Sequence, residues 1–144
     1  MVPAKFHNQY RQNQISTSSQ GKLILMMYEG AIRFSKMAIA GMTEGDLSKK
    51  GLYIQKTHDI VNELSLALNM EKGGEVARKL ESLYQFILRQ LTLANIKSDK
   101  KALESVVRVL TPLYEAWNQL LSVTETPEEP PQQPGKVKPF VSRC

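Results

Sequence analysis

Cysteine, histidine and long apolar runs are scarce in this chain of 144 residues. The single cysteine, Cys144, cannot form an internal disulfide. The longest unbroken apolar run extends from Leu23 to Tyr28, far short of the ~20 residues that cross a bilayer, so we expect no membrane insertion. The first 20 residues also lack the apolar stretch of a signal peptide. Together these absences predict a reducing, cytoplasmic setting.

Patterns that support catalysis or bind metal ions and cofactors are missing as well. The two histidines, His7 and His58, do not have the Glu-x-x-His spacing of metal sites in helical bundles. The sequence contains no Cys-x-x-Cys pair and no Gly-x-Gly-x-x-Gly fingerprint, and Lys72-Gly73-Gly74 lies in no phosphate-loop pattern. We therefore expect no enzyme activity, no cofactor and no metal site.

The charge is modest and dispersed. The chain carries 19 Lys and Arg against 14 Asp and Glu, a net charge of +5, and adjacent basic pairs occur only at Lys49-Lys50, Arg78-Lys79 and Lys100-Lys101. A nucleic-acid-binding protein usually gathers its basic residues on one face. The scatter favours a solvated surface and no nucleic-acid partner. A basic helical module that binds nucleic acid or associates with itself stays the alternative.

Apolar periodicity predicts an all-α fold with four helices, over about 19–41, 46–68, 75–96 and 98–121. Ser18 or Ser19 can cap the first helix, Asp46 or Ser48 the second and Ser98 or Asp99 the fourth, while Gly73-Gly74 belongs to a turn. Short connections force sequential helices to run antiparallel, so the expected architecture is an up-down-up-down bundle.

Composition divides the chain into three parts. Residues 1–17 form a polar N-terminal arm with three apolar anchors, Phe6, Tyr10 and Ile15. Residues 18–123 form the four-helix bundle. Residues 124–144 hold five of the seven prolines, so we expect a disordered, proline-rich tail that does not pack on the bundle.

The helices carry more apolar surface than one core requires. In the first helix the apolar residues cover an arc of roughly 260°, and Leu52, Leu66 and Met70 lie opposite the core stripe of the second. The third helix has a normal core stripe, from which Phe86 and Leu93 are displaced by roughly 60–80°. The stripe comprises Val76, Leu80, Leu83, Tyr84, Ile87, Leu88, Leu91 and Ala94.

Two explanations account for the surplus. The N-terminal arm can fold back over part of it, or the surplus can form a groove for an apolar segment of a partner protein. The surplus occurs on three helices, which favours the partner. Phe86 and Leu93 are then the best candidate contacts on geometric grounds.

Several short stretches, in order, resemble the flagellin-specific export chaperone family. The resemblance covers about residues 10 to 117 and all four predicted helices. It is carried by Tyr10 with Asn13 and Ile15, Gly21-Lys-Leu-Ile-Leu-Met-Met-Tyr-Glu-Gly-Ala-Ile32, Ile60-Val-Asn-Glu-Leu64, Glu71-Lys-Gly-Gly-Glu-Val-Ala77, Leu80, Leu83-Tyr84, Leu91, Ala94-Asn95, Asp99 and Glu115-Ala-Trp117.

The resemblance implies a cytoplasmic, non-enzymatic chaperone that binds the disordered C-terminal segment of flagellin. Such a chaperone prevents premature polymerisation and assists delivery to the flagellar type III export apparatus. Components of the export gate are further candidate partners, and the expected state is a monomer or weak homodimer. In the family, the N-terminal region around the tyrosine is mobile and frames the binding site, which assigns that role here to Tyr10 and Ile15.

Two further residues within the resemblance are candidate flagellin contacts with a competing structural role. Tyr28 lies near the edge of the main face of its helix and fits either core or surface. Asn95 closes the third predicted helix, where it can instead satisfy backbone groups. The sequence departs from the family at Pro112 inside the fourth helix, which predicts a kink near Arg108 to Pro112.

Overall fold

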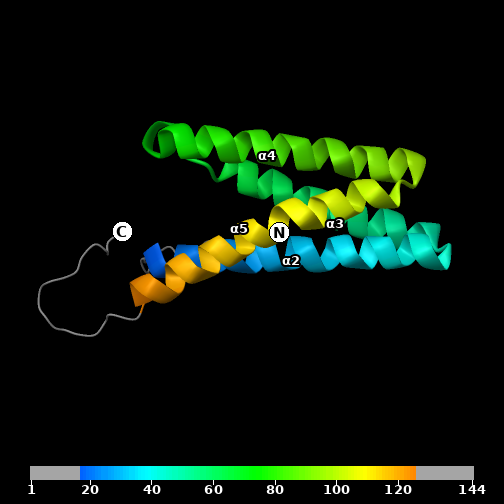
Figure 1. Ribbon diagram of the computed structural model, residues 1–144, viewed down its shortest axis with the longest axis horizontal. Helices are drawn as coiled ribbons and strands as arrows, with labels where there is room; N and C mark the ends of the chain where they lie inside the picture. The colour runs from blue at the N-terminus through cyan, green and yellow to red at the C-terminus, as the bar shows by residue number, and fades with distance from the viewer. Residues whose placement is uncertain (1–16, 126–144) are drawn as a thin grey trace, which may run out of the picture. The chain divides into compact units, whose positions relative to one another are not determined.

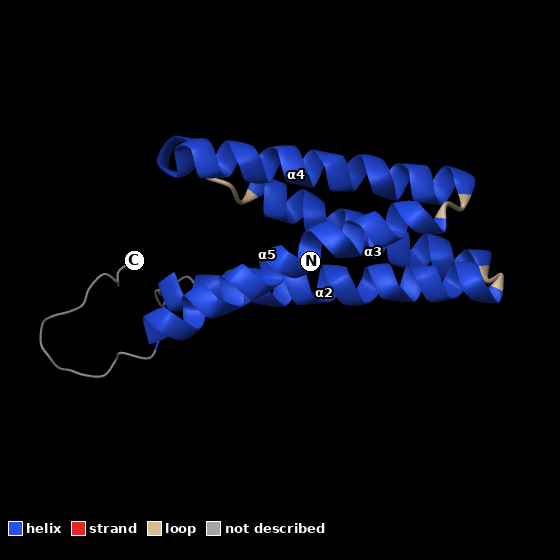
Figure 2. Cartoon of the chain, in the orientation of Figure 1, coloured by secondary structure: helices blue, strands red, loops and turns tan. Residues whose placement is uncertain are grey.

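The computed structural model describes residues 17–125, and these form four α-helices joined by short connections (Figure 2). The helices are α2 (Thr17–Glu44), α3 (Leu47–Leu66), α4 (Met70–Lys97) and α5 (Lys100–Glu125). No strand occurs among the residues described, which confirms the all-α prediction. Tyr10, Ile15 and the proline-rich tail from residue 126 onward lie outside them.

The chain divides into two compact units. The larger, Met26–Tyr114, contains α3, α4 and the adjoining parts of α2 and α5. The described part of the smaller unit comprises residues 17–25 of α2 and 115–125 of α5. Within the larger unit, successive helices run in opposite directions (Figure 1), which confirms the up-down-up-down prediction. The boundaries of the bundle at residues 18 and 123 stay a prediction.

Small side chains occupy the buried centre of α2. Ala31, Ser35 and Ala38 are all completely buried, and the Ser35 hydroxyl donates to the Ala31 carbonyl at 2.8 Å. The large apolar residues of α2 that flank them, such as Phe34 and Met37, are only half-buried. Apart from Tyr28 of α2, the larger core side chains of this unit come from the other three helices: Ile54, Val61, Leu64, Tyr84, Ile87, Leu91, Leu103, Val106 and Leu110.

Side-chain caps begin three of the helices, as helix N-termini require. Asp46 accepts a hydrogen bond from the Lys49 amide at 3.0 Å before α3, and Asn69 accepts one from the Lys72 amide at 2.9 Å before α4. Asp99 accepts one from the amide two residues further on, at 3.0 Å, before α5. The caps predicted at Asp46 and Asp99 are confirmed.

Two predicted helix starts are wrong. Helix α2 begins at Thr17, so Ser18 and Ser19 lie inside it rather than capping it. Helix α4 begins at Met70 rather than near residue 75, because Asn69 caps a first turn that sequence reasoning assigned to the connection. The chain still breaks where glycine was expected to break it, since Gly74 has φ 51° and ψ −125° inside α4.

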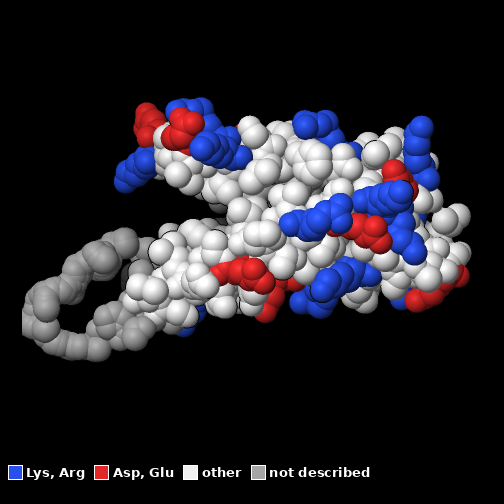
Figure 3. All heavy atoms as spheres, viewed as in Figure 1, with Lys and Arg blue, Asp and Glu red and all other residues white. Residues whose placement is uncertain are grey.

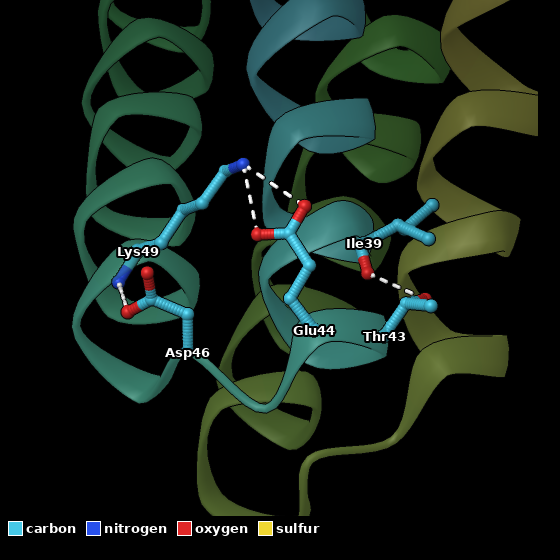
Figure 4. Close-up of polar contacts among 5 residues, drawn as sticks. All are labelled: Ile39, Thr43, Glu44, Asp46 and Lys49. Carbon is cyan, nitrogen blue, oxygen red and sulfur yellow. Dashed lines mark hydrogen bonds and ion pairs between the residues drawn. The ribbon is translucent and has the colours of Figure 1, made fainter.

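The corner between α2 and α3 is tightly closed. The Asp46 amide donates to the Gly41 carbonyl at 2.8 Å, and the Lys49 ammonium pairs with Glu44 at 3.2 Å (Figure 4). A side-chain carbon built on Gly41 would lie only 2.7 Å from the backbone nitrogen of Lys50. The absent side chain of Gly41 therefore allows the end of α2 to approach the first turn of α3.

Lys50 fastens the start of α3 to the end of α4. Its ammonium donates to the Asn95 carbonyl at 3.1 Å and to the Ser98 hydroxyl at 2.8 Å, and the residue as a whole is buried. A cation suits this position, because helix C-termini carry unpaired carbonyls and partial negative charge. Ser98 itself ends α4 in the left-handed conformation, with φ 49°.

The smaller unit joins the first turns of α2 to the last turns of α5. The Trp117 indole nitrogen donates to the Gly21 carbonyl at 2.9 Å. Gly21 has no side chain, and the Leu121 methyl groups fill the space where a side-chain carbon would stand. Trp117 is thus a structural residue of this unit.

Helix α5 continues through Pro112 from Lys100 to Glu125. Proline removes a backbone donor from a helix, which is the reason for expecting a kink. The kink near Arg108 to Pro112 stays a prediction. None of the helices in the described part of the chain is long and apolar enough to span a bilayer.

The close approach at Gly41 predicts that Gly41→Ala lowers the free energy of unfolding by about 1–3 kcal/mol, because a backbone-to-backbone clash cannot relax by a rotamer change. Gly51, inside α3, has no heavy atom within 4 Å of its would-be side chain. The matched change Gly51→Ala should raise stability by about 0.5–1 kcal/mol. Urea unfolding of both variants measures the contrast, and equal effects would contradict the tight corner.

Candidate partner-binding surface

Phe86 and Leu93 lie on α4 outside its buried stripe. The buried residues of this helix are Ala77, Tyr84, Ile87, Leu91 and Ala94. Phe86 and Leu93 are both half-buried and lie seven residues apart, which places them on one line along the helix. They are partly accessible apolar positions, as their displacement from the core stripe indicated.

Tyr28 lies in the core, where it is 4% exposed. Its hydroxyl forms a hydrogen bond with that of Tyr84, 2.5 Å away, which ties α2 to α4. Burial raises the pKa of Tyr28 and, more strongly, that of Tyr84, for which the hydrogen bond to Tyr28 adds to the effect. The sequence allowed Tyr28 to lie either in the core or at the surface, and the structure places it in the core.

Asn95 lies one turn before the end of α4 and is exposed. Its backbone carbonyl is the group that accepts from the buried Lys50 ammonium. The helix ends at Lys97 and Ser98 is its C-terminal cap, so Asn95 does not cap it. The Asn95 side chain is left facing outward beside the exposed Ile96, which has 73% of its surface accessible.

Three strongly exposed apolar residues surround the connection between α3 and α4. Leu66 is 76% exposed, Met70 45% and Val76 65%. We call these three residues the α3–α4 corner. Leu66 and Met70 are exposed, as the sequence indicated. Leu66 lies on α3, whereas Met70 is the first residue of α4 rather than part of the preceding helix.

Val76 corrects the predicted core stripe of α4. Sequence reasoning placed it on the buried side by continuing one helical wheel back from Tyr84. Val76 lies two residues after Gly74, whose backbone is not helical. The break at Gly74 leaves Val76 in the first turn after it, so no preceding turn aligns its side chain with the core. The exposed residues Leu47 and Ile96 were also missed, since each lies at a helix end, where an apolar side chain can pass beyond the core.

Charged groups on this surface are mixed in sign. On the face shown in Figure 3, basic and acidic side chains are interspersed, with broad uncharged areas between them. Only two ion pairs join described residues, Lys49–Glu44 and Arg78–Glu75. Groups of three or more His, Cys, Asp or Glu that could hold a metal ion are lacking in residues 17–125.

Comparison with known proteins gives consistent results. The family model described as "Flagellar protein FliS" matches residues 3–124. The chain is 37% identical over 114 residues to the flagellar secretion chaperone FliS of Campylobacter jejuni, covering 79% of this chain and 89% of that protein. It is 35% identical to the flagellar secretion chaperone FliS of Vibrio cholerae, covering 75% of this chain and 79% of the relative.

A solved structure has the same fold. The crystal structure of a bacterial flagellar chaperone superimposes with a TM-score of 0.69 and 24% sequence identity. The match covers 83% of this chain and 97% of the other. The likeness extends over nearly the whole of that protein, so the two chains share the same fold.

The Tyr28–Tyr84 hydrogen bond predicts a coupled effect on stability. Tyr28→Phe leaves the buried Tyr84 hydroxyl without its partner and should lower the free energy of unfolding by about 1–3 kcal/mol. Replacing both tyrosines by phenylalanine removes both polar groups, so the double variant should lose less than the sum of the two single variants. Urea denaturation of the four proteins measures the coupling, and strictly additive losses would contradict it.

The raised pKa values of the same pair predict alkaline destabilisation. Unfolded tyrosine ionises near pH 10, whereas the folded pair ionises at higher pH, so above about pH 10 the native state binds more protons than the unfolded state. The contribution to stability is complete below pH 10 and is lost as the pH rises above it. Denaturation between pH 9 and 11 should show a steeper fall for wild type than for Tyr28→Phe/Tyr84→Phe.

Proposed function

Because this chain belongs to the FliS family of flagellar secretion chaperones, we propose that it binds the C-terminal segment of flagellin in the cytoplasm. Bound there, the segment cannot polymerise prematurely and is held ready for delivery to the flagellar type III export apparatus. Components of the export gate are the proposed receivers of the complex. The protein acts by binding alone and not as an enzyme.

The observation that carries this proposal is the amount of apolar surface left outside the core. Ten large apolar side chains are between 38% and 76% exposed, and every described helix contributes at least two of them. A chaperone can bury such surface against an apolar segment that is unfolded on its own. The part of this surface that we propose for flagellin lies on α4 and at its connection with α3.

We propose that Phe86 and Leu93 supply the central contacts on α4. They are half-buried, so their rings and methyl groups are held in place but still reach the surface. Side chains that are already ordered lose little conformational entropy on binding. The α3–α4 corner of Leu66, Met70 and Val76 offers further apolar area on the same unit.

The other candidate contacts take different roles. Tyr10 and Ile15, before the described residues, are proposed to frame the binding site and to leave it when flagellin binds. Asn95 is proposed to offer an amide at the end of α4 for backbone groups of the segment. Tyr28 contributes from beneath, because its hydrogen bond to Tyr84 holds α2 against the helix that carries Phe86 and Leu93.

Calorimetric titration with the C-terminal segment of flagellin from the same organism tests the proposal. The expected result is a one-to-one complex with a negative heat-capacity change and weak dependence on salt, the signature of apolar burial coupled to folding. Affinity that falls steeply with salt would favour nucleic-acid binding instead. Concentration-dependent self-association that flagellin does not alter would favour a dimer.

The contact residues have their own prediction. Phe86→Ala/Leu93→Ala should weaken binding of the flagellin segment by about tenfold or more, because two partly ordered apolar contacts are lost. Gln55→Ala/Asn62→Ala, two exposed residues with the same spacing on α3, should leave the affinity unchanged. Equal effects of the two pairs would remove Phe86 and Leu93 from the site.

A further inference from the structure

Two cations share one aromatic ring on the face where α2 and α3 meet. The Phe34 ring on α2 lies 5.6 Å from the Tyr53 ring on α3, with the two planes tilted by 31°. The Arg33 guanidinium lies 5.1 Å from the centroid of Phe34, and the Lys56 ammonium lies 5.5 Å from it. Both cations are within the ~6 Å range of cation–π attraction and come from different helices.

Neither cation has an acidic partner among residues 17–125. The two ion pairs of the described chain lie elsewhere, at Glu44 and Glu75. Asp59, one turn after Lys56, instead accepts a hydrogen bond from Gln55 at 2.9 Å. The two positive charges repel each other. A carboxylate placed between them would be attracted by both and would reduce that repulsion.

Apolar side chains line the same face at helical spacing. Phe34 and Tyr53 are half-buried at its centre, and Met37 and Ile60 are half-buried one turn away from Phe34 and Lys56. Gly30 lies one turn before Phe34, and a side-chain carbon built there would be 3.4 Å from Ile60. The Ile60 side chain of α3 therefore lies close to Gly30 of α2.

Two strongly exposed apolar residues flank the cations, one on each helix. Met26, seven residues before Arg33, is 62% exposed, and Leu52, four residues before Lys56, is 51% exposed. We call the whole set the α2–α3 face: Met26, Arg33, Phe34, Leu52, Tyr53 and Lys56. Its pattern is a cationic centre with an aliphatic side chain along each helix.

We propose that the α2–α3 face binds an amphipathic helix of a second protein, one that carries carboxylates one turn apart within an aliphatic stripe. The carboxylates lie against Arg33 and Lys56, and the stripe covers Met26 and Leu52. This partner is distinct from flagellin, whose proposed contacts Phe86 and Leu93 lie on α4. The Asp59 carboxylate, one turn after Lys56, would repel a phosphate backbone, which disfavours nucleic acid as the occupant.

A designed peptide provides the probe. It is a helix of about 16 residues with a leucine stripe and two glutamates one turn apart, and its matched control has glutamines in place of the glutamates. The glutamate peptide should bind the full-length chain about fivefold or more tightly than the glutamine peptide. Arg33→Gln/Lys56→Gln should remove that difference, since the attraction between charges is then lost.

The control variant is Lys79→Gln/Arg89→Gln, two exposed cations on α4 that keep the net charge change the same. It should retain the preference for the glutamate peptide. A preference that both variants lose equally reflects overall charge and would overturn the proposal. Equal binding of the two peptides to wild type would overturn it as well.

Competition separates this inference from the proposed function. The flagellin segment should neither displace the glutamate peptide nor bind more weakly to Arg33→Gln/Lys56→Gln. Displacement of the peptide by the flagellin segment, or by a single-stranded oligonucleotide of about ten nucleotides, would overturn the inference. Flagellin binding is measured on its own in the same experiment, so either idea can fail while the other stands.

Discussion

The small buried residues of α2 are the constraint on which the rest of the larger unit depends. Ala31, Ser35 and Ala38 occupy the centre of the helix and are completely buried. Small side chains let neighbouring helices approach, and closely packed interiors leave no room for larger ones at the same positions. Apart from Tyr28, the large apolar side chains of α2 in this unit are consequently displaced to its flanks, where Phe34 and Met37 remain half-buried. The surplus apolar surface is thus a consequence of how the core is filled.

The ends of the helices are fixed by polar contacts rather than by burial. Gly41 lets the first turn of α3 approach the end of α2, and Asp46 caps that turn. Lys50 extends from the same turn to the Asn95 carbonyl near the end of α4. These contacts define where each helix ends independently of the apolar faces between them. A partner can therefore occupy apolar surface along the helices without competing for the groups that hold the corners together.

Much of the fold could be predicted from periodicity and capping. The four helices, their antiparallel order and the caps at Asp46 and Asp99 follow from local chemistry that acts within one turn. The extension of α4 back to Met70 could not be predicted, because it depends on Asn69 capping a short turn before Gly74. Lys50 was equally hidden, since its partners at Asn95 and Ser98 are distant in sequence.

The candidate site was predicted less completely, for a physical reason. A helical wheel ranks positions by their direction around one axis, so it identified Phe86 and Leu93 as lying outside the core stripe. It also treated Val76 as a core residue, because it assumed one continuous helix across the break at Gly74. A wheel also counts large apolar residues and overlooks Ala31 and Ser35, which define the true core side of α2. Tyr28 follows from that geometry: its ring lies on the same side as Ala31 and Ser35, so its hydroxyl meets Tyr84 inside the bundle. A residue that carries the family resemblance, such as Tyr28, can therefore lie in the core, while the proposed contacts Phe86 and Leu93 lie on the partly accessible side of α4.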